Sequence, residues 1–410
     1  MKKRFINSDI DTLLVSTEIM RNPYPVYQRL RNEAPILWSE RWQSWVVSRY
    51  QDVNASLKDK ENLSNEARQS LLFSQFTPDQ LEKTAFLRTY FAQKDIINSD
   101  PPDHTRMRAP VQKAMMPRVI AEMEQKTRRL AKELFDKAVQ KQTFDFVENF
   151  AYPFPVILAA EIMGAPSEDQ LKFKDWTADF LAFQGTGLAD FERTLRSQKS
   201  LVDFVGYIER LVEKRRSQPE ADLISALLES DYSTPELVST CCTLLVAGHE
   251  TTTNLLGNIV LLLHRHPEQW NALKNEPQLI PSAVEESLRY EAPKQRNFRR
   301  AKKTHDFGGA TIEANDMVFQ LIGSGNRDER FFENPDCYDI RRSPNAHLSF
   351  GSGIHFCVGA SLARLEAKVF LELFLNFPGR IRMANDDSFE WQDRVQMRGP
   401  GKMFLDVLPS

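Results

Sequence analysis

The residue best suited to chemistry in this sequence is a lone cysteine in a glycine-rich stretch. Cys357 lies in FGSGIHFCVGASLARLE (350–366), directly before a segment whose alanine and leucine content is typical of a helix. Gly351, Gly353 and Gly359 carry no side chains, so a bulky flat group could approach the backbone there. The positive dipole end of the following helix favours the thiolate. A thiolate in this setting is a suitable ligand for a haem iron.

Two other interpretations of Cys357 compete with iron ligation. Most single cysteines are buried and inert. A nucleophilic thiolate would need a base, and the nearest one, His355, lies in a predicted loop without the signature of a cysteine protease. The surrounding glycines and the following helix favour iron ligation over both.

A second group of polar residues interrupts an apolar helical stretch, LLVAGHETTTNLL (244–256). Gly248 costs about 1 kcal/mol relative to alanine in a helix interior, and threonine hydroxyls can bond back to carbonyl groups and bend a helix. A charge on Glu250 is costly among apolar neighbours. One interpretation is a polar stripe at a helix–helix contact. The other is a break in helix regularity that opens a groove beside Glu250 and Thr251.

Glu286 and Arg289 form a third candidate pair, because residues three apart share one face of a helix. On this spacing alone, the pair would be a solvated ion pair at the surface. The other cysteines, Cys241, Cys242 and Cys337, form no C-x-x-C pair, which argues against a zinc or thioredoxin-like site.

Helices must position most of these residues. Apolar residues at three- and four-residue spacing predict helices over 117–140, 155–163, 168–184, 190–215, 222–230, 267–274, 280–291 and 358–377. A longer helix begins at Thr234 and stops before Pro267; its roughly 30 residues would span about 45 Å. The stretch 43–50 is predicted as a strand and 295–322 as β-rich. The fold class is therefore mainly α with a smaller β region.

The composition bounds the class of protein. The chain has 410 residues, 41% of them hydrophobic, and a formal net charge of -3, which argues against nucleic acid as a partner. The N-terminus lacks the apolar core of a signal peptide, and the longest apolar stretch, NIVLLL (258–263), is too short to span a membrane. No linker or repeat divides the chain. We expect a soluble, cytoplasmic monomer without a membrane anchor, formed by one domain over 1–410.

The stretch around Cys357 resembles the haem-binding signature of the cytochrome P-450 superfamily, F-x-x-G-x-[HR]-x-C-x-G. Every fixed position is filled, by Phe350, Gly353, His355, Cys357 and Gly359. Other family motifs follow in the right order along the chain, at 22–36, 100–108, 247–252, 286–289 and 326–342. The overall resemblance is to soluble bacterial members. It implies the cytochrome P-450 fold, with haem b between the long central helix and the helix after the cysteine loop.

The resemblance also implies roles for individual residues. The expected haem contacts are Cys357 as the iron ligand, Phe350, Gly351 and Gly359 in its loop, His104, Arg108, Arg299 and His355 at the propionates, and Ala247 and Gly248 at the dioxygen groove. Glu250 and Thr251 would deliver protons to the reduced dioxygen. Glu286 and Arg289 would be a buried structural pair, and no chemistry is expected of His249.

The implied activity is that of a monooxygenase, which inserts one oxygen atom of O2 into a C–H bond and reduces the other atom to water. The chain has no flavin or iron–sulfur region, so a ferredoxin or flavodoxin with its reductase is expected as the electron donor. Its docking cations would be Arg106, Lys113, Arg341 and Arg342, which could equally be solvated surface charges. A peroxide-driven enzyme ranks lower because Glu250 and Thr251 are both present. A haem gas-binding protein ranks lower because no output domain is visible.

The substrate is expected to be a hydrophobic or amphipathic small molecule such as a lipid, steroid, terpenoid or polyketide. The resemblance places Phe73, Phe86, Leu244, Gln295, Arg296 and Met397 near it, although the phenylalanines could be plain core. The stretch APKQRNFRR (292–300) departs from relatives, which have mainly apolar residues here. Side chains alternate along a strand, so Arg296 faces away from Asn297. We expect Arg296 either to reach solvent or a second haem contact, or, with Gln295, to bind a carboxylate of the substrate.

Overall fold

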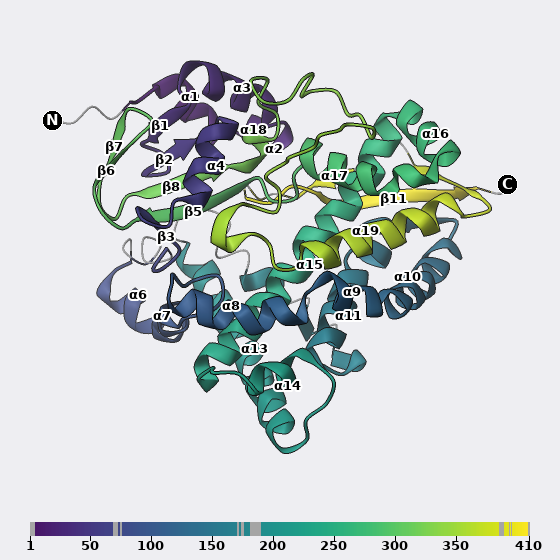
Figure 1. Ribbon diagram of the computed structural model, residues 1–410, viewed down its shortest axis with the longest axis horizontal. Coiled ribbons are helices and arrows are strands. Elements are labelled where there is room, and N and C mark those ends of the chain that lie inside the picture. The colour runs from purple at the N-terminus through teal and green to yellow at the C-terminus, as the bar shows by residue number, and fades with distance from the viewer. Residues whose placement is uncertain are drawn as a thin grey trace. The chain divides into compact units, whose positions relative to one another are not determined.

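The structure is a computed structural model that describes residues 5–408, apart from 69–72, 74–75, 170–171, 174–175, 181–189, 385–388, 393 and 395. The chain divides into two compact units. The first contains Met1–Leu63, Ile120–Pro155 and Glu250–Ser410, and the second contains Ser64–Val119 and Val156–His249. The order of helices and strands is shown in Figure 1.

The first unit is built around a five-stranded sheet. Its strand order is β1 (Ile36–Ser39), β2 (Ser44–Val47), β8 (Met317–Leu321), β5 (Arg296–Ala301) and β3 (Leu63–Ser64). β1 pairs antiparallel with β2, β2 parallel with β8, and β8 antiparallel with β5. The sheet therefore joins two stretches of chain that are far apart in sequence.

The two faces of this sheet are covered by different helices. On one face, α1 (Ser8–Leu13), α2 (Thr17–Arg21) and α3 (Tyr24–Glu33) share a buried apolar cluster with Leu37, Val46 and Leu321. On the other face, α4 (Tyr50–Lys58) shares a cluster with Trp45 and Val318. Apolar residues alternate between the faces because successive side chains of a strand point in opposite directions.

A second sheet in the same unit contains the end of the chain. β11 (Pro400–Leu408) pairs with β10 (Phe389–Trp391), β4 (Thr143–Asp145) and β9 (Arg380–Met383). The remaining elements of the first unit are η1 (Val147–Ala151), α10 (Glu124–Val139), α16 (Pro267–Asn275), η3 (Pro277–Leu279), α17 (Ile280–Tyr290), α18 (Ile322–Gly325), η4 (Gly353–His355), α19 (Ala360–Leu375) and the hairpin of β6 (His305–Phe307) and β7 (Ala310–Ile312). Both α10 and α17 pack against α19.

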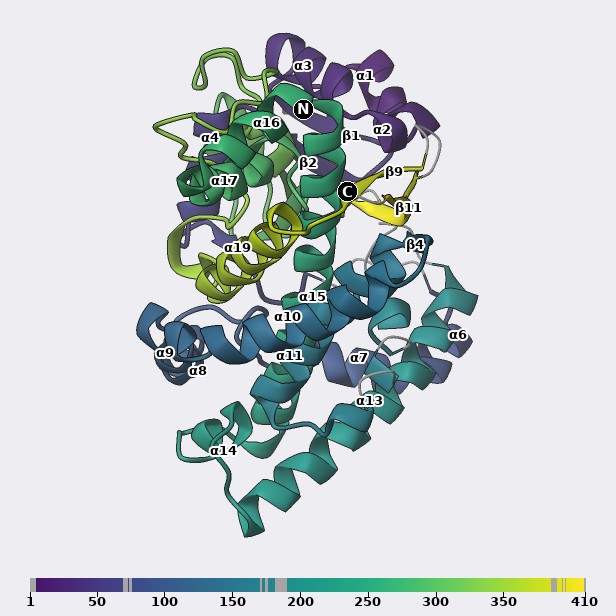
Figure 2. The same cartoon turned by 90° about the vertical axis from the view of Figure 1, so that its right-hand side faces the viewer.

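The second unit is helical in the part that the structure describes. It includes α6 (Pro78–Lys83), α7 (Ala85–Ala92), α8 (Asp103–Ala114), η2 (Ser167–Asp169), α13 (Phe191–Ser217) and α14 (Leu223–Leu228). α9 (Pro117–Glu122), α11 (Pro153–Met163) and α15 (Thr234–Arg265) have residues in both units. Asp190 and Asp222 cap α13 and α14 with their side chains, which accept from backbone N–H groups of the first turn. These two helices pack together (Figure 2).

The predicted helices correspond to observed ones. The helix predicted over 117–140 is two helices, α9 and α10, and part of the one predicted over 168–184 lies outside the described residues. The predicted strand over 43–50 ends at Val47, because Tyr50 already begins α4. No described helix is long and apolar enough to cross a membrane.

The expected break in the long helix is absent. α15 is a continuous α-helix of 32 residues from Thr234 to Arg265, which includes Gly248 and the three threonines after it. Thr252 and Thr253 are buried, so packing supports one side of the helix next to Gly248, the position where its intrinsic propensity is weakest. Tertiary packing overrides such a local preference.

Candidate active site

The loop that carries Cys357 has a tightly defined backbone. Gly351 and Gly353 have positive φ angles of 72° and 73°, a conformation that side chains disfavour. The Cys357 N–H donates to the Phe350 carbonyl at 2.8 Å, which closes the loop. A side chain at Gly353 would lie 3.0 Å from the carbonyl oxygen of Leu57 in α4. The glycines therefore serve a close backbone approach, and the Cys357 side chain is exposed at the end of the loop, just before α19.

Arg364 supports this loop from the first turns of α19. No motif in the sequence points to this residue. Its guanidinium lies 4.4 Å from the centre of the Phe350 ring and donates to both oxygens of Glu285 at 2.7 and 2.8 Å. Burial opposes ionisation of Glu285, but hydrogen bonds from Arg364 and His347 lower the pKa of Glu285 to about 2. Its hydrogen bond to Glu285, and more weakly the charge of Cys357, raise the pKa of Arg364. A permanent cation near the sulfur favours the thiolate.

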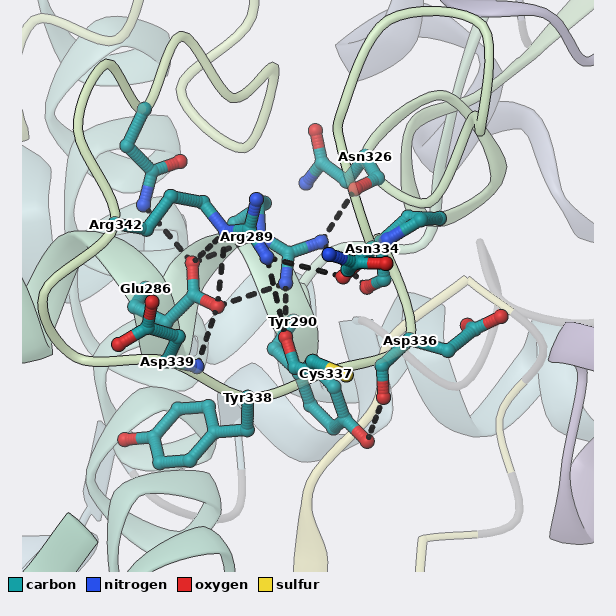
Figure 3. A network of polar contacts seen from close by, with 12 residues as sticks. Glu286, Arg289, Tyr290, Asn326, Asn334, Asp336, Cys337, Tyr338, Asp339 and Arg342 are labelled. Carbon is teal, nitrogen blue, oxygen red and sulfur yellow. Dashed lines mark hydrogen bonds and ion pairs between the residues drawn. The ribbon is translucent and has the colours of Figure 1, made fainter.

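Behind the loop, Glu286 and Arg289 form a buried ion pair with both side chains 0% exposed (Figure 3). Two parallel hydrogen bonds of 2.8 Å join the guanidinium to the carboxylate. The remaining guanidinium hydrogens reach the backbone carbonyls of Asn326, Pro335 and Cys337 at 2.8–3.0 Å. The surface interpretation of this pair is therefore wrong.

The cations expected to dock an electron donor are mostly engaged within the protein. Arg342 is largely buried and donates to Glu286 and to the carbonyls of Glu333, Asn334 and Cys337. Arg341 pairs with Glu276, and Arg106 pairs with Glu236. Arg342 is thus part of the buried network rather than a free surface charge. Lys113 is exposed at the end of α8.

One stripe of α15 is left partly open. Of residues 237–263, all of which the structure describes, those that are not buried are Thr243, Leu244, Ala247, Gly248 and Thr251. The last four follow the i, i+3, i+4, i+7 spacing of a single helix face. An exposed stripe in the middle of an otherwise buried helix is compatible with a large apolar group lying against it. The exposed Cys357 thiol in its glycine loop is, on its own unit, compatible with the same kind of group.

The next residue on this helix, His249, is turned into packing. It is buried, with Nδ1 2.7 Å from the Leu245 carbonyl and Nε2 3.1 Å from the Thr177 hydroxyl. These two contacts occupy both nitrogens of the imidazole ring.

Glu250 lies on another face of α15 and is paired. Its carboxylate Oε1 accepts from the guanidinium of Arg394, which lies in the loop between β10 and β11. Burial raises the pKa of Glu250, and the charge of Arg394 counteracts this. No local pattern could reveal this partner, because Arg394 is 144 residues away and outside any motif.

The residues expected at the haem propionates are distributed over both units. In the second unit, His104 is buried in α8, and burial, together with the nearby Arg108, lowers the pKa of His104 to about 4. An imidazole can donate a hydrogen bond to a carboxylate in its neutral or in its charged form. In the first unit, Arg299 is buried and donates to the Phe298 carbonyl, whereas His355 is half-exposed in η4.

Arg296 does not lie where the sequence analysis expected it. Its guanidinium lies 4.2 Å from the ring centre of Trp42 and 4.8 Å from that of Phe319. Trp42 packs against the cluster of α1–α3, whereas α4, which contacts η4, covers the other face of the sheet. Arg296 is 2% exposed, so it does not reach solvent, and burial lowers its pKa to about 10. The proposed contact between this cation and a substrate carboxylate thus loses its geometric basis.

The other expected substrate residues lie in varied surroundings. Gln295 is buried and donates to the Ala292 carbonyl, and Met397 is half-buried in a bridge with Lys294. In the second unit, Phe73 is buried in an aromatic cluster with Phe76, Phe91, Tyr90 and Phe180. Phe86 is on the exposed side of α7.

Comparison with known proteins agrees with this geometry. The sequence profile of the family described as Cytochrome P450 matches residues 42–378. The polyketide biosynthesis cytochrome P450 PksS of Bacillus subtilis is 36% identical over 408 residues, which cover 96% of each chain. The structure of P450BioI in complex with an acyl carrier protein ligated to hexadec-9Z-enoic acid superposes with a TM-score of 0.86 at 32% identity, covering 95% of this chain and 100% of that one. CYP109E1 of Bacillus megaterium in complex with testosterone gives 0.84 at 33%, covering 95% and 99%.

Proposed function

The chain belongs to the cytochrome P450 family of haem-binding monooxygenases, and we propose that it hydroxylates a hydrophobic or amphipathic small molecule with electrons from a separate protein. The exposed Cys357 thiol in its glycine loop is the observation that carries this proposal. Relatives named for polyketide biosynthesis, and solved with a fatty acyl carrier protein or with testosterone, support this class of substrate.

Haem b is the cofactor of this family, and with a thiolate ligand it supplies the activation of dioxygen. Cys357 is the proposed ligand, and the nearby guanidinium of Arg364 favours its ionised form. His104, Arg108, Arg299 and His355 are proposed for the propionates. The open stripe of α15, with Leu244, Ala247, Gly248 and Thr251, is proposed to face the cofactor and the substrate.

Proton delivery is assigned to Glu250 and Thr251. Oxygen insertion consumes two electrons and two protons, with the second oxygen atom leaving as water. Burial raises the pKa of Glu250, which favours the protonated carboxyl that a proton donor needs. Thr251 is one residue further along α15, on the open side of the helix. Its hydroxyl can accept one hydrogen bond and donate another, so it can pass a proton on.

The substrate and partner assignments are narrower than the sequence suggested. Phe73, Gln295 and Met397 remain candidates for substrate contact, as does the exposed Phe86. Arg296 is withdrawn because it lies against Trp42 and Phe319. A ferredoxin or flavodoxin with its reductase remains the proposed electron donor, and Lys113, which is exposed at the end of α8, is the candidate docking cation.

Turnover under three conditions tests the function. We expect product from a lipid, steroid or polyketide, preselected by a ferric spin-state shift, with reduced ferredoxin, reductase and air. We expect far less product with peroxide alone. The reason is that this chain has Glu250 and Thr251, which supply the protons that turnover with O2 requires and that a peroxide-driven reaction does not need. Equal or greater product with peroxide would establish the peroxygenase, and a spectroscopic response without product under any condition would indicate a gas-binding protein.

Replacing Thr251 with alanine should leave haem binding intact and reduce the product formed per reductant consumed by roughly tenfold, since positioned proton transfer contributes about 10²–10⁴ in rate. The missing electrons should appear as hydrogen peroxide. Thr252→Ala is the matched control, because this neighbouring threonine is buried and outside the open stripe. An unchanged ratio in Thr251→Ala would remove this hydroxyl from the mechanism.

A further inference from the structure

A row of polar side chains on α15 faces the loop between β10 and β11. We call this loop the hairpin loop and mean by it its described residues, Gln392, Arg394 and 396–399. Glu250, Asn254 and Asn258 are four residues apart, so they share one helix face. All three are buried, and all lie in the same unit as the hairpin loop.

Each of the three side chains contacts the hairpin loop. Glu250 pairs with Arg394, Asn254 accepts from the Gln392 side chain at 2.9 Å, and Asn258 donates to the Arg398 carbonyl at 3.0 Å. The backbone is close as well, since a side chain at Gly399 would lie 2.4 Å from the Asn254 oxygen. The loop is therefore fastened along the helix, and the ion pair is its attachment nearest to Thr251.

The ion pair differs from the other two contacts in charge and exposure. The Arg394 side chain is 26% exposed, whereas that of Glu250 is 9% exposed. Oε2 of Glu250 is buried and has no hydrogen-bond partner among the described residues. When one oxygen of a carboxylate is ion-paired, the other can accept a hydrogen bond. It can then exchange a proton with water or with a neighbouring hydroxyl.

We infer that Arg394 is a positioning residue for proton delivery, which fastens Glu250 to the hairpin loop and favours the carboxylate form of its side chain. This inference rests on the proposed function of Glu250. Among the described residues, Arg394 is the charged group whose field acts on Glu250, while His249 of the same helix is engaged with Leu245 and Thr177.

The sign of the effect follows from the charges. Burial favours the neutral carboxyl of Glu250 and Arg394 favours the carboxylate. Removal of the cation leaves only burial, so the carboxyl should hold its proton to a higher pH. In Arg394→Gln, which keeps a hydrogen-bond donor but loses the charge, the titration midpoint of Glu250 should rise by at least one pH unit, a tenfold change in proton affinity.

Infrared spectroscopy of the holoenzyme measures this midpoint through the carbonyl band of the protonated carboxyl, with Glu250→Gln to identify the band. Arg394→Lys should return the midpoint close to that of the wild type. Gln392→Ala is the matched control: it removes the neutral contact of 2.9 Å between the hairpin loop and Asn254 but keeps the charge, so it should not move the midpoint.

The same variants are then compared for product formed per reductant as a function of pH. The alkaline limit of the coupled reaction should shift upward with the infrared midpoint in Arg394→Gln and remain in place in Gln392→Ala. An unshifted midpoint, or equal shifts in both variants, would overturn the role of the Arg394 charge. A shifted midpoint in a protein that forms no product with any donor would sustain the pairing and contradict the proposed function instead.

Discussion

Replacing Cys357 with serine should abolish the red-shifted band that carbon monoxide gives with a reduced haem-thiolate protein, and with it all monooxygenase turnover. A serine hydroxyl stays protonated at neutral pH and cannot donate electron density as a thiolate does. The loop itself should survive, because its closing hydrogen bond comes from the backbone N–H of residue 357 and not from the sulfur.

Cys337→Ser is the matched control for this variant. Cys337 is also exposed, and its backbone takes part in hydrogen bonds with Arg289, Arg342 and Asn334, which the change from sulfur to oxygen leaves in place. We expect the control to keep the band and the turnover. Retention of the band in Cys357→Ser, with protein of native circular dichroism, would show that another residue ligates the iron.

Replacing Arg289 with methionine should lower the free energy of unfolding by about 3–5 kcal/mol. The change leaves Glu286 as a buried carboxylate without its two 2.8 Å partners and removes donors from three backbone carbonyls. Arg342 and Asn345 still donate to Glu286, so part of its charge remains compensated. Because domains are stable by only about 5–15 kcal/mol, such a loss is large.

Urea unfolding of the holoenzyme, followed by circular dichroism and haem absorbance, measures the effect. Arg330→Met is the control within the segment 326–342, since Arg330 is 43% exposed and its ion pairs are with Glu329 and, at 3.4 Å, with Asp328. Its replacement should cost less than about 1 kcal/mol. Similar losses in the two variants would contradict the structural importance of the buried pair.

Helices with a strong apolar period could be predicted from the sequence, and so could the loop around Cys357. The first residues could not, because α1, α2 and α3 are short and their apolar residues are few. Short helices take their stability from packing, which no local pattern contains. The same holds for the Glu286–Arg289 pair. The three-residue spacing predicted the contact between the two side chains. It could not predict their burial, which depends on the chain segments at 326 and 335–337 that cover the pair.

Arg296, Arg364 and Arg394 show why the site was harder to predict than the fold. Strand alternation separated Arg296 from Asn297 but could not tell which face α1–α3 cover. The partners of Arg364 and Arg394 are 79 and 144 residues away. An arginine looks the same in sequence whether it is solvated, stacked on an aromatic ring or paired with a buried acid, and only the tertiary neighbours decide.

The strand order of the first sheet has a consequence for synthesis of the protein on the ribosome. β2 pairs with β1 within a few residues, but its other neighbour, β8, emerges about 270 residues later. At about 5–20 residues per second, that edge waits roughly 15–50 s for its partner. During this time it is an unpaired, apolar strand edge of the kind that recruits other chains. A nascent chain of this protein therefore depends on chaperones or on the early helices α1–α4 to shield β2 until translation reaches Met317.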